Sequence, residues 1–140
     1  MTSLYNIVVS APRWPAVFLD RDGVLIHDAH YLRRPEQVRF YPGAAKAVAS
    51  LRKAGYKVVV VSNQSGIARG YFTVWDLARI HAHVRRELKK SGAVLDGIYY
   101  CPHGPQARCA CRKPKPGMLR RAARELKLDL RGSYMVGDNT

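Results

Sequence analysis

Short, mainly apolar runs alternate along this 140-residue chain with segments of helical periodicity, and this alternation constrains the fold more than any other feature. The short runs lie at 16–19, 57–61, 97–100 and 134–136. Such runs are typical of strands that are buried on both faces. Apolar residues recur at helical spacing over 42–51, 73–92 and 118–126. Strands that alternate with helices predict a Rossmann-like α/β domain, in which helices cover both faces of a parallel sheet.

Local signals support these boundaries. Gly55 can close the first helix in the left-handed conformation, and Thr73 with Asp76 resembles a capping box at the start of the second. Met118 and Met135 are expected in the core. The chain is long enough for one domain, so residues 1–140 are predicted to form a single unit.

Composition excludes several classes of protein. A hydrophobic content of 47% is too high for a disordered chain. No apolar run approaches the roughly 18 residues of a membrane-spanning helix, and Pro12 and Pro15 interrupt the region where a signal peptide needs an apolar segment. Three cysteines, with Cys109 and Cys111 one residue apart, do not fit a disulfide framework. We therefore expect a cytoplasmic protein without a membrane partner.

The chain is strongly basic, with 24 Lys and Arg against 10 Asp and Glu and a net charge of +14. This balance predicts either a polyanionic partner or a small phosphorylated substrate. Much of the charge recurs at helical spacing, as at Arg85, Arg86, Lys89 and Lys90. Such spacing favours a solvated helix face over a nucleic-acid footprint.

Polar residues stand where the predicted strands stop: Asp20 and Asp22 after the first, Ser62 and Asn63 after the second, and Asp138 after the fourth. Ligands of parallel sheets bind beyond the carboxyl ends of the strands. Taken alone, Asp-x-Asp-Gly is equally compatible with a plain turn, and it lacks the closing Glu of a calcium loop. The combination predicts a site at this edge of the sheet.

These residues suit phosphate chemistry. A carboxylate that approaches a phosphomonoester dianion to ~4 Å meets a repulsion of roughly 8 kcal/mol at an effective dielectric near 20. Mg²⁺ held by Asp20, Asp138 and the backbone carbonyl of Asp22 can offset this repulsion. Lys113 supplies a second positive charge, and the Ser62 hydroxyl can hold a phosphate oxygen.

A second group has the composition of a metal site. Three thiols and one imidazole fall between positions 101 and 111, at Cys101, His103, Cys109 and Cys111. This set predicts a closed, structural Zn²⁺ site. Free cysteines beside a surface histidine are the alternative. The metal is expected to order the loop that carries Arg112 and Lys113.

The polar strand ends resemble a known superfamily. Asp20-x-Asp22-Gly23, Ser62-Asn63, Lys113-Pro114 and Gly137-Asp138 are similar, in order and position, to the four motifs of the haloacid dehalogenase superfamily of aspartate-based phosphatases. The stretches 18–24, 62–73, 96–103 and 111–119 more narrowly resemble the D-glycero-D-manno-heptose 1,7-bisphosphate phosphatase branch.

This resemblance implies that Asp20 is the nucleophile, which forms an aspartyl-phosphate, and that Asp22 is the general acid and base. It implies removal of the C7 phosphate from the heptose bisphosphate. Separately, we expect the protein to be a monomer. Substrate contacts are then expected from Asp28, His30, Tyr31, Asn63, Gln64, Ser65, Arg69, Arg112 and Asn139. It also implies a further strand and helix after Asp138, which the 140 residues do not include.

Three other functions stay open. A histidinol-phosphate phosphatase shares every motif and has a similar spacing of metal ligands. A polynucleotide 3′-phosphatase would explain the basic charge. A non-catalytic nucleic-acid binder could use the cysteine and histidine loop together with the basic helices. This function leaves Asp20, Asp22 and Asp138 without a role.

Overall fold

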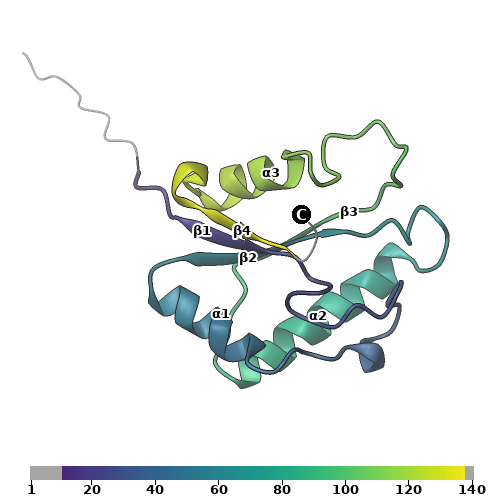
Figure 1. Cartoon of the computed structure of the whole chain (residues 1–140), viewed down its shortest axis with the longest axis horizontal. Helices are drawn as coiled ribbons and strands as arrows, with labels where there is room; N and C mark the ends of the chain where they lie inside the picture. Colours follow the sequence, from purple (N-terminus) through teal and green to yellow (C-terminus); the bar gives the residue numbers. More distant parts are fainter. Residues whose placement is uncertain (1–10, 138–140) are drawn as a thin grey trace, which may run out of the picture.

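The computed structural model describes residues 11–137, whose strands form one parallel sheet in the order β3-β2-β1-β4. The strands are β1 (Ala16–Leu19), β2 (Lys57–Asn63), β3 (Gly97–Cys101) and β4 (Tyr134–Val136). Helices α1 (Ala44–Lys53) and α2 (Val74–Lys90) lie on one face, and α3 (Gly117–Leu126) lies on the other (Figure 1). The predicted α/β architecture is confirmed. Two short 3₁₀ helices, Pro35–Gln37 and Leu130–Gly132, were not predicted.

The two central strands divide their side chains between two cores. Successive residues of a strand point to opposite faces. Alternate residues of β1 and β2 pack toward α1 and α2, namely Val17, Leu19, Val58 and Val60. The remaining ones pack toward α3, namely Ala16, Phe18, Val59 and Val61. All eight are buried, which fixes the carboxyl ends of both strands between the helical layers.

Helix α2 begins as predicted. Thr73 Oγ1 accepts the backbone N–H of Asp76 at 3.1 Å, and Asp76 Oδ2 accepts the backbone N–H of Thr73 at 2.8 Å. The first helix is followed by Gly55 with φ +99°, the predicted left-handed conformation. No helix in residues 11–137 is long and apolar enough to cross a membrane.

One core prediction is wrong. Met118 is buried on α3, but Met135 is 44% exposed. Met135 lies in β4, an edge strand of the sheet, and all three residues of β4 are exposed in the described part of the chain. The apolar run at 134–136 identified a strand correctly without revealing that its side chains lie on the surface.

Candidate active site and zinc-binding loop

The predicted site residues meet at the carboxyl edge of the sheet. Asp20 directly follows β1, and its backbone N–H donates to the Val136 carbonyl of β4 at 2.9 Å. Ser62 and Asn63 are the last two residues of β2, which extends two residues beyond its predicted end. The segment before α3 brings Lys113 to the same edge. Asp138 and Asn139 lie outside the described residues.

Lys113 forms an ion pair with the Asp20 carboxylate and donates to the Val61 carbonyl at 3.2 Å. Asn63 holds the backbone of Lys113 from both sides. Its Oδ1 accepts the Lys113 N–H at 2.9 Å, and its Nδ2 donates to the Lys113 carbonyl at 3.3 Å. The side chain of Asn63 therefore positions Lys113 opposite Asp20.

A cavity of about 630 Å³ opens beside this ion pair. Its lining includes the polar residues Asp20, Asn63 and Lys113, together with Met118, Met135 and Gly137. Its volume falls in the range of small-molecule sites, about 300–1,000 Å³. A charged pair beside a cavity of this size suits a small anionic ligand.

Asp22 and Ser62 are linked through Gln64. The Gln64 amide Nε2 donates to Asp22 Oδ2 at 3.3 Å and also hydrogen-bonds to the buried Ser62 hydroxyl. Arg21 donates to both carboxylate oxygens of Asp22, each at 3.0 Å. The burial of Arg21 and its contacts with Asp22 were not predicted, because in the sequence a charged residue between two aspartates is indistinguishable from a surface residue.

The predicted substrate loop meets the loop that follows β2. The rings of Tyr31 and Tyr71 lie edge to face with centroids 4.7 Å apart, and the Arg69 guanidinium lies 5.8 Å from the Tyr31 ring centroid. Asp28 Oδ1 accepts the backbone N–H of His30 at 3.0 Å. The contact between Tyr71 and Tyr31 was not predicted, because a single aromatic residue in a loop carries no signal in the sequence.

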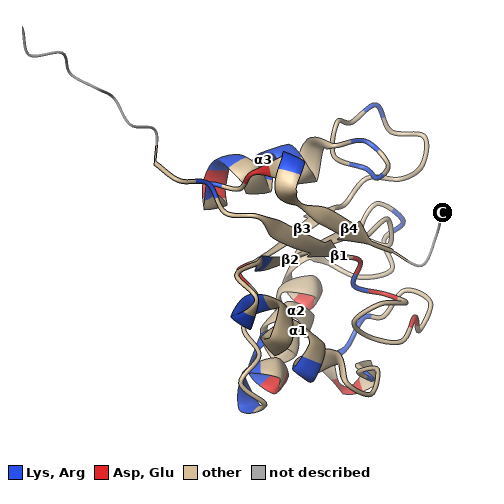
Figure 2. Ribbon diagram, turned by 60° about the vertical axis from the view of Figure 1, so that its left-hand side comes forward, with Lys and Arg blue, Asp and Glu red and all other residues tan. Residues whose placement is uncertain are grey.

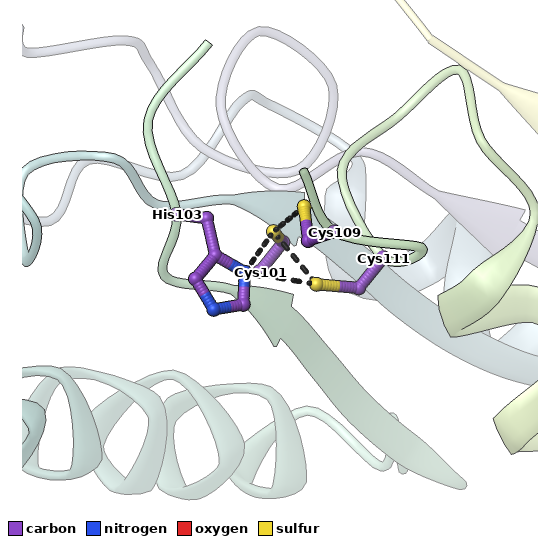
Figure 3. A group of neighbouring side chains, drawn as sticks. All are labelled: Cys101, His103, Cys109 and Cys111. Atoms are coloured by element: carbon purple, nitrogen blue, oxygen red, sulfur yellow. Dashed lines mark hydrogen bonds between the residues drawn. The ribbon is translucent and has the colours of Figure 1, made fainter. Parts of the chain in front are cut away.

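The four predicted zinc ligands converge (Figure 3). Their donor atoms all lie within 4.8 Å of one another. The Cys101 sulfur lies 3.8 Å from the Cys109 sulfur and 2.9 Å from the Cys111 sulfur, and His103 Nδ1 lies 3.4 Å from the Cys101 sulfur and 3.3 Å from the Cys111 sulfur. Structural Zn²⁺ is bound by four cysteine and histidine donors of this kind, with Zn–S bonds of about 2.3 Å and Zn–N bonds of about 2.0–2.1 Å. The donor set therefore fits zinc.

The predicted zinc ligands lie in different environments. The backbone N–H of Arg112 lowers the pKa of the Cys109 thiol to about 6. Burial raises the pKa of the Cys101 thiol to about 12. Cys101 closes β3, whereas Cys109 and Cys111 lie in the loop between β3 and α3. The cluster thus joins the end of a buried strand to this loop.

Hydrogen bonds connect the loop that carries the predicted zinc ligands (residues 101–111, here the zinc loop) to the segment around Lys113. Arg112 Nη1 donates to the His103 carbonyl at 3.2 Å, and Lys115 Nζ donates to the Cys109 carbonyl at 2.8 Å. The backbone N–H of Gly117, the first residue of α3, donates to the Ala110 carbonyl at 2.9 Å. Order in the zinc loop is therefore coupled to the position of Lys113.

Known proteins share this sequence and arrangement. A model of the haloacid dehalogenase-like hydrolases matches residues 27–140. The D-glycero-beta-D-manno-heptose-1,7-bisphosphate 7-phosphatase of Photorhabdus laumondii is 46% identical over 131 residues, which cover 89% of this chain and 70% of the relative. The protein of the same name from Rhodopseudomonas palustris is 41% identical over 95% of this chain and 78% of its own length. The chain belongs to the heptose-bisphosphate phosphatase family of haloacid dehalogenase-like hydrolases.

Solved members of the family agree with the fold. The D,D-heptose 1.7-bisphosphate phosphatase of B. bronchiseptica, in complex with magnesium and phosphate, is 45% identical with a TM-score of 0.81 over 89% of this chain and 70% of that one. The enzyme from Burkholderia thailandensis is 31% identical with a TM-score of 0.62 over 89% of this chain and 66% of that one. This chain is a phosphatase of the family, and its enzyme class is as predicted.

Proposed function

We propose that this chain removes the C7 phosphate of D-glycero-D-manno-heptose 1,7-bisphosphate in a Mg²⁺-dependent reaction. Relatives that bear the name of this activity are 41–47% identical over most of the chain. The ion pair between Asp20 and Lys113 beside the cavity is the observation that carries the proposal. It places a carboxylate and a fixed positive charge at the same edge of a parallel sheet.

In the first step, an Asp20 oxygen attacks the phosphorus atom and the bond to the C7 oxygen breaks. Asp22 donates its proton to that oxygen, so the sugar leaves as an alcohol. Lys113 stabilises the negative charge on the transferred group, and the Ser62 hydroxyl donates to one of its oxygens.

In the second step, Asp22 takes a proton from a water molecule that attacks the aspartyl-phosphate. Phosphate leaves, and the Asp20 carboxylate is restored. The oxygen donors of Asp20, Asp22 and Asp138 suit Mg²⁺, which neutralises phosphate charge when it is bound. Zn²⁺ in the cysteine and histidine cluster has a structural role, because four protein ligands leave no open position for water.

The sugar and the second phosphate would contact the loops around this edge. Tyr31 and Tyr71 offer aromatic faces to the sugar, and Arg69 beside them suits a phosphate. We also assign contacts to Asp28, His30, Gln64, Ser65, Arg112 and Asn139. The zinc thiols must stay reduced, so we place the reaction in the cytoplasm, and we propose a monomer.

Phosphate release by the purified chain with Mg²⁺ tests this function. The substrates are the heptose 1,7-bisphosphate, histidinol phosphate and a 3′-phosphorylated oligonucleotide, and Asp20→Asn serves as the inactive control. We expect the highest kcat/KM for the bisphosphate and no turnover by Asp20→Asn, because the nucleophile is lost. Preference for either other substrate would overturn the proposed specificity, and activity in Asp20→Asn would overturn the proposed chemistry.

A further inference from the structure

The guanidinium group of Arg21 is buried directly behind Asp22. Arg21 is only 2% exposed although it lies in the loop after β1. Its Nε donates to Asp22 Oδ1 and its Nη2 donates to Asp22 Oδ2, each at 3.0 Å. This bidentate interaction holds both oxygens of the carboxylate, so it fixes the plane of the group as well as its position.

The far side of the same guanidinium group contacts helix α2. Arg21 Nη1 lies 3.2 Å from Nε2 of His81, whose side chain is also buried. Burial and the nearby Arg21 and Arg85 lower the pKa of His81 to about 3. The ring is therefore neutral at pH 7, and its Nε2 can accept a hydrogen bond from Arg21.

His81 lies on a rigid support. It follows Ile80 in the buried stripe of α2, which also contains Leu77 and Val84. These neighbours pack into the core beneath the sheet, so they prevent the helix from shifting at this point. A chain of contacts thus runs from the helix core through His81 and Arg21 to the carboxylate of Asp22.

We propose that Arg21 and His81 are positioning residues that hold the Asp22 carboxylate in the orientation needed for proton transfer. The inference rests on the proposed function, in which Asp22 is the general acid and base. A buried guanidinium is costly unless it is paired, and the Asp22 carboxylate supplies its counter-charge. His81 then restricts the direction from which Arg21 can reach Asp22. Neither residue is expected to touch the substrate.

The geometry predicts a particular kinetic effect. Small displacements of a catalytic group can cost about 100-fold in rate, and general acid–base catalysis contributes about 10²–10⁴-fold. Replacing His81 by Leu removes the acceptor for Arg21, so kcat should fall by about 10- to 100-fold while KM changes by less than about 2-fold. His81→Gln keeps an acceptor and should recover most of the rate. His83→Leu, on the same helix, is the matched control and should behave as wild type.

A double-mutant cycle separates positioning from a general loss of structure. His81→Leu is measured alone and in the Asp22→Asn background, with single-turnover phosphate release for the slow variants. If His81 acts through Asp22, the substitution should lose its effect in that background. Thermal denaturation monitors folding. If His81→Leu does not fold, Arg21→Lys replaces it in the cycle. Lysine keeps the positive charge but cannot make the bidentate interaction with Asp22.

The outcomes distinguish the two proposals. Normal turnover by Asp22→Asn would overturn the role assigned to Asp22 and with it the proposed mechanism. In another outcome, Asp22→Asn loses most of its activity while His81→Leu, or Arg21→Lys in its place, lowers the rate equally with and without Asp22→Asn. That result would overturn only the positioning role. A wild-type kcat in folded His81→Leu would also overturn it. The inference is supported if the positioning substitution lowers the rate of phosphate release only in the protein that retains Asp22.

Discussion

Lys113 and Lys115 lie two residues apart in the sequence and line the same cavity, but their ammonium groups have different partners. Lys113 pairs with Asp20, whereas the ammonium of Lys115 donates to the Cys109 carbonyl in the zinc loop. Lys113→Met should therefore lower kcat by about 10²–10³-fold, the usual cost of removing one donor that stabilises the transition state. Steady-state phosphate release provides the measurement. Lys115→Met should stay within about 2-fold of wild type, and an equal loss in both variants would contradict this assignment.

His81 also predicts how stability depends on pH. Its pKa is about 3 in the folded chain, below the ordinary histidine value of 6.5, because burial disfavours the charged ring. Between these values the unfolded chain binds the extra proton, so stability is lost as pH falls below about 6.5. The contribution approaches 1.4 kcal/mol per pH unit, or about 2 kcal/mol between pH 6.5 and pH 5.

Urea denaturation of wild type and His81→Gln at pH 7 and pH 5 measures this contribution. The glutamine side chain does not titrate, so the variant should lose about 2 kcal/mol less than wild type between the two pH values. Equal losses in the two proteins would show that His81 does not stay neutral when it is buried.

At the scale of elements, the backbone at Gly117, the first residue of α3, packs closely against the backbone of the loop between β3 and α3. A Cβ at Gly117 would lie 2.2 Å from the Ala110 carbonyl oxygen and 2.9 Å from the Cys111 Cα. The backbone of the zinc loop would have to move, so Gly117→Ala should destabilise the fold by about 1–3 kcal/mol and weaken zinc binding.

Thermal unfolding and the zinc content after dialysis against a chelator check this prediction. Gly104→Ala is the matched control in the same loop, because nothing lies within 4 Å of a Cβ there. It should retain zinc and stability. If Gly117→Ala retained both as well, the packing of α3 against the zinc loop would be unimportant for the site.

At the scale of the whole molecule, the net charge of +14 favours an anionic substrate. Figure 2 shows Lys and Arg on the helices of both layers and in the loops at the carboxyl edge of the sheet. Salt screens charges beyond a Debye length of about 10 Å at 0.1 M. Raising NaCl from about 20 mM to about 300 mM should therefore lower kcat/KM for the bisphosphate several-fold, with a smaller change in kcat.

Steady-state assays of phosphate release at a fixed Mg²⁺ concentration measure how kcat and KM depend on salt. Repeating the series with potassium glutamate controls for competition by chloride. If kcat/KM were constant across both series, the basic surface would have no part in attracting the substrate, and its charge would only keep the chain dissolved.

Much of this protein could be predicted from its sequence because the decisive signals are local. The apolar runs identified all the strands of the described sheet, since a strand buried on both faces needs a short continuous run of apolar residues. Thr73 and Asp76 marked the start of α2, because a capping box is completed within three residues. The four zinc ligands lie within one loop and its adjoining strand, so their spacing was sufficient.

Tertiary structure decided the features that depend on residues far apart in the sequence. Arg21 meets His81, and Tyr31 meets Tyr71, only because separate loops and helices are packed around one sheet. Met135 is exposed because β4 contributes to neither core of the described residues, and the run at 134–136 does not show which elements will cover a strand. The sequence by itself determined which helices and strands form and which four side chains make up the candidate zinc site, because neighbouring residues specify backbone conformation and metal-ligand spacing. Only packing decided which buried side chain contacts the Asp22 carboxylate, because burial and orientation are properties of the assembled core.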